Sequence, residues 1–351
     1  MRRASWPSVY LVFSVSLVLS FVSSVRAACA QPVDLVGTRA SGMGGAFTAV
    51  ADDATATWWN PAGMAGGAYF NALIEAGRHS EPPTERTPAG DPQSASRADT
   101  RSFAVAFPAL GLSYYRLLVS EIQPQTSTGT TSAVRQEGGA TEVRLRSMVM
   151  NQFGATVGQS LGSHLVVGST FKLVSAGAAS QTQPAATGSL DAASSIEAST
   201  ETHVSLDIGA MASIGPARFG LTVRNVKQPE FGSGTDAFTL SRQARAGVAL
   251  STGSRGVVGT ATLAVDADLT KTTTVLGEER RVAAGGEVWL PTRTFGVRGG
   301  VSASTIGATR TALSAGASAA VKKGLYIDGE FTGGTDQGRR GWGVALRVTY
   351  P

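Results

Sequence analysis

The chain has 351 residues, of which 43 are glycine, and charged residues make up only 16% of it, against ~25% in an ordinary soluble domain. Its formal net charge is +5, but part of that charge lies in an expected leader and no Lys/Arg cluster follows, so nucleic acid is not a predicted partner. Cys29 is the only cysteine, which excludes a disulfide framework.

Residues 1–30 have the pattern of a secretory signal peptide. A basic start precedes an apolar run over residues 9–22, and the sequence Ala-Cys-Ala at 28–30 supplies a small-x-small cleavage site. The apolar run is shorter than the ~20 residues of a spanning helix. A lipoprotein signal at Cys29 is the competing interpretation, against which Arg26 stands where that signal usually has a large aliphatic residue. Cleavage after residue 30 would leave a mature protein without cysteine.

Residues 31–67 are rich in small side chains and show no strand period. Asp52 or Asp53 can cap a short helix by accepting its free backbone N–H groups. Asn60 precedes a proline and would end that helix, because the proline ring disfavours helical geometry in the residue before it. Glycines that allow close packing or positive φ stand at Gly42, Gly44 and Gly45. We expect this segment to be a plug inside a barrel formed by residues 68–351.

From about residue 68 onward, apolar residues alternate with small or polar ones, which is the period of a strand with two different faces. In the last segment, Trp342, Val344 and Leu346 share one face with Val348 and Tyr350. Several runs approach the ~9–11 residues of a tilted membrane-spanning strand. We count about fourteen runs, near 68–78, 101–108, 111–122, 141–157, 164–177, 199–214, 217–226, 243–251, 256–269, 281–290, 294–303, 310–321, 324–332 and 341–350.

The connections between these runs also have a pattern. An even number of strands suits antiparallel closure, which leaves no backbone edge unpaired in lipid. Long polar connections at 79–100, 123–140, 178–198, 227–242, 270–280 and 333–340 alternate with tight turns, as in bacterial outer-membrane barrels. The predicted fold class is all-β: a transmembrane antiparallel β-barrel of about fourteen strands with an N-terminal lumenal plug, after a cleaved signal peptide.

A family resemblance is carried by Gly-Met-Gly-Gly-Ala at 42–46, Ala-Asp-Asp at 51–53 and Trp-Asn-Pro-Ala-Gly at 59–63. In this order and spacing, these pieces resemble the FadL-like superfamily of outer-membrane barrels, which includes long-chain fatty-acid transporters and the PorV-like and conjugal-transfer TraF-like barrels. A weaker similarity to the PorV-like branch lies at 206–209 and 219–225. The resemblance implies a fourteen-strand barrel with an N-terminal hatch. In the fatty-acid transporters, hydrophobic ligand displaces that hatch and leaves sideways into the bilayer.

The resemblance places Asn60, Pro61 and Ala62 in the hatch. The candidate gating and ligand-contact residues are those of the same motifs: Gly42, Met43, Gly44, Gly45, Phe47, Asp52, Asp53, Trp58, Trp59, Asn60, Pro61 and Ala62. The tryptophan pair has two interpretations: plug core against the barrel wall, or, with Met43, Phe47 and Met64, an apolar surface that a hydrophobic substrate touches. The chain departs from the family by ending on Pro351, so Tyr350 would have to supply the aromatic residue that the assembly machinery reads. Its loops also lack the apolar helices of an external fatty-acid groove.

Nothing in the sequence points to catalysis. His79, His164 and His203 lie on different segments without metal-ligand spacing, and no Gly-x-Ser-x-Gly elbow occurs. The glycines at 42–45 lack the preceding strand and the following Gly-Lys-Ser/Thr of a phosphate-binding loop. Inward-facing charges of mixed sign, such as Asp207 and Arg347, would pair with one another, contact the plug, or line a selective pore. We expect no enzyme activity, no cofactor and no metal site.

The predicted function is an outer-membrane channel or transporter for hydrophobic or amphipathic small molecules, gated by the N-terminal plug. The alternative is a PorV-like barrel that acts as a shuttle or scaffold for protein secretion or assembly. The expected location is the outer membrane of a Gram-negative-type (diderm) bacterium. Expected partners are outer-membrane lipid, the outer-membrane assembly machinery, and either a hydrophobic small-molecule ligand or a secreted protein.

Overall fold

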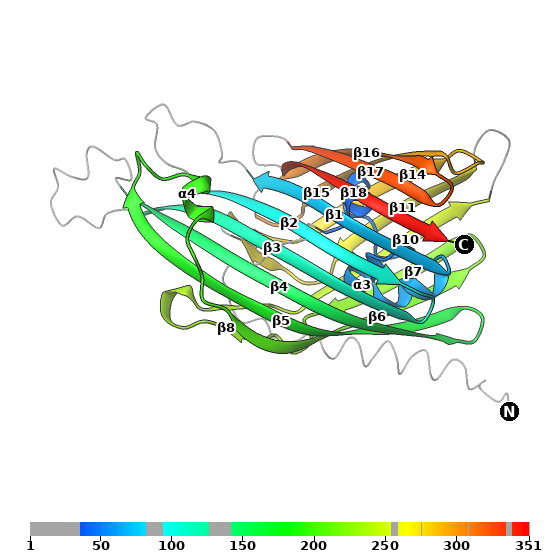
Figure 1. Cartoon of the computed structure of the whole chain (residues 1–351), viewed down its shortest axis with the longest axis horizontal. Coiled ribbons are helices and arrows are strands. Elements are labelled where there is room, and N and C mark those ends of the chain that lie inside the picture. The colour runs from blue at the N-terminus through cyan, green and yellow to red at the C-terminus, as the bar shows by residue number, and fades with distance from the viewer. Residues whose placement is uncertain are drawn as a thin grey trace.

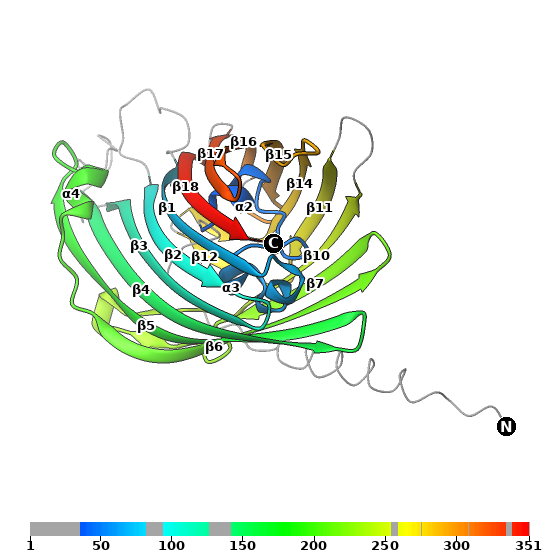
Figure 2. The same ribbon diagram turned by 45° about the vertical axis from the view of Figure 1, so that its right-hand side comes forward.

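The computed structural model describes residues 36–81, 94–125, 142–253, 259–274, 276–307, 309–334 and 339–350; the predicted signal peptide lies outside them. Fourteen strands form one closed barrel (Figures 1 and 2). Their bounds are β1 (Phe70–Glu81), β2 (Ala95–Ala106), β3 (Leu110–Gln125), β4 (Glu142–Leu161), β5 (Leu165–Pro184), β6 (Glu201–Ile214), β7 (Ala217–Arg224), β10 (Gln243–Thr252), β11 (Thr260–Asp268), β14 (Arg281–Trp289), β15 (Phe295–Ser304), β16 (Thr311–Lys322), β17 (Leu325–Gly334) and β18 (Arg340–Tyr350).

The barrel closes where its last strand returns to its first. β18 pairs with β1 in continuous antiparallel register, from Phe70 opposite Tyr350 to Ser80 opposite Arg340. Around the ring each barrel strand pairs with the next one in the chain, and the elements numbered between β7 and β10 and between β11 and β14 belong to loops. Closure satisfies backbone groups that lipid could not hydrate. The predicted all-β barrel of about fourteen strands is confirmed.

The two faces of the wall differ as the alternation predicts. On β18, Trp342, Val344 and Leu346 point outward and are 47–49% exposed, whereas Arg347 on the other face is 7% exposed. Each of the fourteen barrel strands carries at least one large apolar side chain that is exposed on the outside. An apolar surface that continues around the whole ring suits lipid rather than water as its surroundings.

Most strand ends agree closely with the prediction; the exceptions are the long-loop ends of β1, β2, β3 and β5 and the short-turn ends of β4, at Leu161, and β11, at Thr260. β1 continues to Glu81 and β5 to Pro184, beyond the predicted ends near 78 and 177, and β2 begins at Ala95 instead of 101. The predicted starts of the long loops at 79 and 178 are therefore wrong. The ladder of backbone hydrogen bonds continues past the band in which one face must be apolar, so the period-2 pattern ends before the strand does.

The long loops carry small elements of their own: α4 (Leu190–Ser194), β8 (Glu230–Phe231), η2 (Gly234–Asp236), β9 (Phe238–Thr239), β12 (Thr272–Thr274) and β13 (Gly277–Glu279). The β8–β9 hairpin turns its aromatic rings inward, where Phe231 and Phe238 are 1% and 3% exposed and stack at 5.3 Å. Arg146 on the inner face of β4 lies 5.9 Å from the Phe238 ring. This hairpin therefore covers part of the lumen from the long-loop end. None of the helices in the described ranges is both long and apolar enough to span a membrane.

Candidate functional site

The barrel lumen contains the chain that precedes β1, which we call the lumenal segment (residues 36–67). It holds α2 (Thr38–Gly42), α3 (Ala56–Trp59) and η1 (Pro61–Gly66), and Figure 2 shows α2 and α3 inside the ring of strands. Most of its residues are buried. Helices of four to six residues do not persist alone in water, so contacts with the barrel wall hold this segment in shape.

The two ends of α3 differ in how well they match the predicted caps. Asp53 accepts a hydrogen bond from the Thr55 backbone N–H at 2.9 Å, but Thr55 itself is the N-cap of α3 and no side chain caps that helix. Asp53 therefore forms a turn before the helix. α3 ends at Trp59 as expected, and Asn60 caps η1 by accepting from the Ala62 N–H at 3.1 Å. Pro61 then fits the first turn of η1, where its missing N–H costs nothing.

Glycines on the inner face of the wall allow the lumenal segment to pack closely against it. A Cβ atom on Gly209 of β6 would lie 2.1 Å from Oδ1 of Asn60, and one on Gly168 of β5 would lie 2.4 Å from the Pro61 carbonyl carbon. The same close approach of the lumenal segment occurs around the barrel at Gly111, Gly220, Gly285 and Gly300. The backbone of the segment thus lies directly against the backbone of the wall, which only residues without a side chain permit.

Three polar side chains of the wall bind backbone N–H groups of the lumenal segment. Glu75 on β1 accepts from Gly37 and Thr38 at 2.8 and 2.9 Å. Asp266 on β11 accepts from the N–H groups of residues 47 and 48 at 2.9 and 2.8 Å. Asn71 on β1 accepts from Ala54 at 2.8 Å. Hydrogen bonds to carboxylates are stronger than neutral ones, so Glu75 and Asp266 are the firmer anchors.

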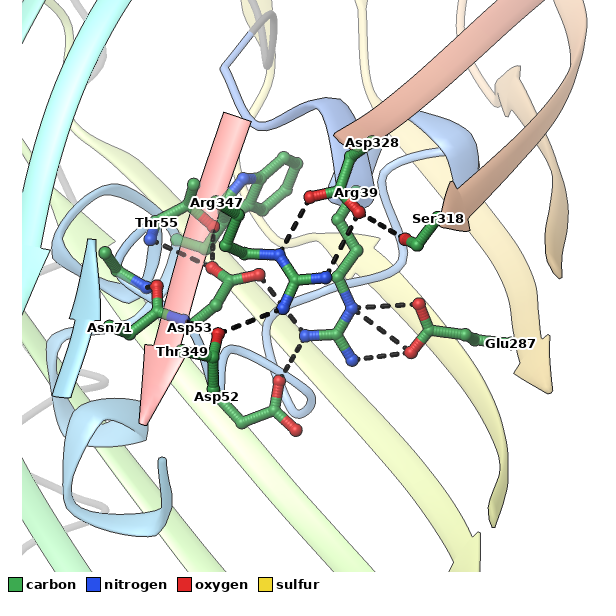
Figure 3. Close-up of polar contacts among 12 residues, drawn as sticks. Arg39, Asp52, Asp53, Thr55, Asn71, Glu287, Ser318, Asp328, Arg347 and Thr349 are labelled. Atoms are coloured by element: carbon green, nitrogen blue, oxygen red, sulfur yellow. Dashed lines mark hydrogen bonds and ion pairs between the residues drawn. The ribbon is translucent and has the colours of Figure 1, made fainter. Parts of the chain in front are cut away.

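Arg39 of α2 joins the segment to itself and to the wall. Its guanidinium donates to Glu287 of β14 at 2.6 to 3.1 Å and also binds Asp52 and Asp53, as Figure 3 shows. Beside it, Arg347 of β18 donates to Asp328 of β17 at 2.8 and 3.1 Å. Asp52 and Asp53 thus neutralise Arg39 within the segment, while Glu287 ties Arg39 to the barrel. The expected pairing of inward charges is present in this cluster.

The two tryptophans form the core of the segment. Trp58 packs edge-on against Tyr115 of β3 with centroids 5.0 Å apart, and the Arg224 guanidinium lies 4.0 Å above its ring. Trp59 packs edge-on against Phe47 at 6.1 Å and donates its indole N–H to the Val36 carbonyl at 2.9 Å. Each is only 2% exposed. Their positions match the interpretation as plug core against the wall.

The remaining predicted residues occupy separate places. Met43 backs onto Gly285 and Gly300 of the wall, whereas the Met64 sulfur approaches Gly111 on β3. Both methionines and Phe47 nevertheless belong to the same buried apolar cluster as the two tryptophans, and each of these side chains is at most 2% exposed, so the group is core of the segment. Gly44 and Gly45 have positive φ, +69° and +86°, as expected. A Cβ on Gly42 would lie 2.8 Å from Cδ of Arg298.

The inner face of the wall carries most of its large apolar side chains on β3 to β6, next to buried polar ones such as Glu121, Arg146, Gln152, Lys172 and Asp207. On β3 to β6 it carries buried apolar side chains: Tyr115, Leu117, Val119, Met148, Met150, Val174, Ala176 and Met211. They form one connected cluster with Trp58 of the lumenal segment and with Phe231, Phe238 and Leu240 near the β8–β9 hairpin. We call this cluster the apolar column. On β14 to β18, by contrast, Glu287, Arg298, Asp328, Glu330 and Arg347 point inward among small residues.

A cavity of about 940 Å³ opens at the short-turn end, beneath the Arg39 cluster. We call it the vestibule. Trp289, Tyr326, Tyr69 and Tyr350 line it together with Arg39, Asp52, Asp53, Glu287 and Arg347 and with residues of the β14–β15 and β16–β17 turns. Trp289 and Tyr326 pack edge-on with centroids 5.6 Å apart.

The histidines remain separate in the fold. Nε2 of His79 lies 2.9 Å from Glu330, Nδ1 of His164 lies 3.1 Å from the Ser213 carbonyl, and His203 packs against Phe231. Within the described ranges, no three His, Cys, Asp or Glu side chains gather as a metal ion would need.

The sequence over residues 87–268 matches the family model described as "F plasmid transfer operon, TraF, protein". That span is more than half of the 351 residues. The chain belongs to this family. No curated protein sequence matches the TraF-family chain.

Solved structures share its fold. The monoaromatic hydrocarbon channel CymD superposes with a TM-score of 0.61 at 10% identity, covering 90% of this chain and 97% of that one. The Ralstonia pickettii toluene transporter TbuX gives 0.57 at 12% identity, covering 91% and 99%. A Pseudomonas aeruginosa FadL homologue gives 0.55 at 12% identity, covering 92% and 99%. The recognition of a FadL-like outer-membrane barrel is confirmed.

Two residues that hold the lumenal segment, Arg39 and Glu75, were not among the predicted site residues. Arg39 stands inside the family motif, 13 residues before Asp52, and a basic residue between two glycine-rich pieces was the available signal. Asp266 and Glu287 are among the inward-facing charges for which contact with the plug was one expectation, whereas Glu75 gave no signal, because an inward carboxylate on a strand has the same sequence pattern whether it binds water or a plug. The wall glycines were read only as composition, although each falls on the inward side of its strand.

Proposed function

We propose that this TraF-family barrel is an outer-membrane channel for small hydrophobic or amphipathic molecules and that the lumenal segment is its gate. The apolar column carries the proposal: apolar side chains from β3 to β6 join Trp58 to the inward-turned aromatics of the β8–β9 hairpin. A channel for ions or sugars would not need such a column in its lumen. The shared fold with proteins described as a monoaromatic hydrocarbon channel and a toluene transporter supports the same class of solute.

The proposed route runs along the barrel axis. Short turns face the periplasm in bacterial barrels, so the β8–β9 hairpin faces outward and the vestibule faces the periplasm. A solute would enter beside the hairpin, follow the apolar column to Trp58, and pass into the vestibule once the lumenal segment moves. The segment is bound by Glu75, Asp266 and Glu287, so the gate opens only if some of these contacts break.

A disulfide lock tests the gate. Oγ1 of Thr38, which a cysteine sulfur would replace, lies 3.2 Å from the place that a Cβ would take on Gly343 of β18, so cysteine side chains at the two positions would meet. We expect Thr38→Cys/Gly343→Cys to take up labelled toluene like the parent when reduced and to lose most of that uptake when oxidised. Each single cysteine variant is the control and should respond to neither condition.

The two parts of the proposal fail in different ways. Full uptake by the oxidised double variant, with the disulfide verified by mass spectrometry, would show that the lumenal segment is not the gate. Uptake by the parent no faster than in cells without the protein would remove the channel function itself.

A second candidate is a scaffold in protein export, favoured by the match to a family described from a plasmid transfer operon. Purification of the full chain from native membranes separates the two candidates. A protein partner recovered in one-to-one ratio, with no toluene uptake, would support the scaffold, whereas uptake without such a partner would support the channel.

A further inference from the structure

The vestibule has an excess of positive charge. Five basic side chains line it, namely Arg39, Arg218, Arg293, Lys323 and Arg347, against three acidic ones, Asp52, Asp53 and Glu287. The acidic groups are engaged by Arg39, and Arg347 is engaged by Asp328 of the wall. A concave site that carries one sign of charge concentrates ions of the other sign, so the vestibule attracts anions.

The excess charge lies at the mouth. Arg218 follows the β6–β7 turn, Arg293 lies in the β14–β15 turn and Lys323 lies in the β16–β17 turn. Within the described part of the chain, the side chains of these three residues make no ion pair or hydrogen bond, and Arg218 and Arg293 act on Asp52 only at longer range. Arg293 and Lys323 are exposed and Arg218 is half-buried. Two turns and the start of β7 thus carry cations at one opening.

Aromatic rings line the same cavity: Tyr69 and Tyr350 are 67% and 69% exposed, whereas Trp289 and Tyr326 are 6% and 9% exposed. Trp289 and Tyr326 form an edge-on pair, and the Arg293 guanidinium lies 6.0 Å from the Trp289 ring. The volume of about 940 Å³ lies within the ~300–1,000 Å³ of ordinary ligand pockets. Guanidinium groups match carboxylates in shape, and within this cavity Arg39 already holds carboxylates.

We propose that the vestibule is a binding site for carboxylates that enter from the short-turn end. Arg218, Arg293 and Lys323 supply the charge, and the exposed rings of Tyr69 and Tyr350 supply a surface for an adjoining flat apolar group. The carboxylate can belong to a free aromatic acid or to acidic side chains of a periplasmic polypeptide. This site goes beyond the proposed channel, because it faces the opposite compartment and binding there requires no passage.

Titration of the purified full chain in detergent micelles tests the site. The probes are benzoate, its neutral analogue benzyl alcohol, a hexaglutamate peptide and inorganic phosphate, followed by calorimetry. We expect benzoate, the peptide or both to bind, and Arg218→Gln/Arg293→Gln/Lys323→Gln to weaken that binding about tenfold, because each exposed cation contributes only modestly. Lys227→Gln, an exposed cation at the long-loop end, is the matched control and should change nothing.

The outcomes separate the sources. Binding of benzoate alone assigns the site to small aromatic acids, and binding of the peptide alone assigns it to a polypeptide. The proposal is overturned if neither carboxylate binds, if benzyl alcohol or phosphate binds as tightly as benzoate, or if the triple variant binds unchanged. Heat-modified gel mobility of each variant verifies the barrel. Toluene uptake is a separate readout, so loss of the channel function would leave this test intact.

Discussion

At the scale of single residues, Trp59 contacts three other side chains or backbone groups. Its ring meets Phe47, its indole N–H is bound by Val36, and the Arg245 guanidinium of β10 lies 5.4 Å from it. Removing a fully buried aromatic side chain costs ~3–5 kcal/mol where the site cannot collapse. That loss would fall on the lumenal segment, because the barrel wall has its own hydrogen-bond ladder.

We therefore expect Trp59→Ala to raise hydrogen exchange in the lumenal segment and to leave exchange in the barrel strands unchanged. Trp342→Ala, which removes a lipid-facing ring, is the control. Parent-like exchange in residues 36–67 of the Trp59 variant would mean that this ring does not hold the segment.

Gly209 tests the fit between the lumenal segment and the wall. An added methyl would overlap Asn60 and approach Cδ of Pro61 to 2.9 Å, and overpacking of this kind costs ~1–3 kcal/mol. Gly209→Ala should displace the turn at Asn60 and expose it to protease in a properly assembled barrel. Gly329→Ala, where nothing lies within 4 Å of the new Cβ, should behave like the parent. Equal protection of both variants from protease would contradict the close contact between Gly209 and Asn60.

At the scale of elements, a cluster of charges joins strand ends at the long-loop side. Glu279 of β13 accepts from Arg281 at 3.1 Å and pairs with Arg310 at 2.9 Å, and Arg281 also donates to Glu81 at the end of β1 at 2.9 Å. Burial of Glu279 opposes its ionisation, but Arg281 and Arg310 outweigh that effect and hold the pKa of Glu279 below its usual value of 4.5.

The pH dependence of this cluster follows from the direction of that shift. A carboxylate whose pKa is lower in the folded state stabilises the fold above its unfolded pKa, and this contribution disappears as the pH falls through the folded pKa. We expect the loop around β12 and β13 to become open to protease below about pH 4, and Glu279→Gln to be equally open at neutral pH. Glu278→Gln, which removes an exposed partner of Lys271, should keep the parent profile. An unchanged profile in the Glu279 variant would contradict this role.

At the scale of the whole molecule, the barrel and the lumenal segment depend on different interactions. The wall is one closed ladder from β1 to β18, and closure alone satisfies its backbone in lipid. The segment adds contacts to the inside but no strand. Its removal should therefore leave a folded barrel with a wider bore.

We expect deletion of residues 36–67 to give protein with normal heat-modified mobility and a severalfold larger single-channel conductance in planar bilayers. Trp59→Ala should give an intermediate, fluctuating conductance, because its segment is loosened and still present. Failure of the deletion variant to form a barrel would show that the segment takes part in assembly.

The strand number and the orientation of the strand faces could be predicted because they depend on local requirements. A strand between lipid and lumen must alternate its side chains, and Trp342, Val344 and Leu346 show that alternation whatever their neighbours are. The absence of such alternation likewise marked residues 31–67 as something other than wall. The long-loop ends of β2 and β5 were predicted wrongly, because hydrogen bonding continues there where lipid no longer imposes a pattern.

The contacts of the candidate site were decided only by the tertiary structure. Arg39 meets Glu287 across 248 positions of the chain, and Gly209 meets Asn60 only because strand register turns that glycine inward. Such pairs depend on how fourteen strands align and on where the lumenal segment settles against them. The sequence by itself determined a closed barrel with an apolar and a polar face, because each strand must separately present apolar side chains to the bilayer. Which residues hold the lumenal segment in place was decided by the assembled ring, because no single strand carries both partners of a contact.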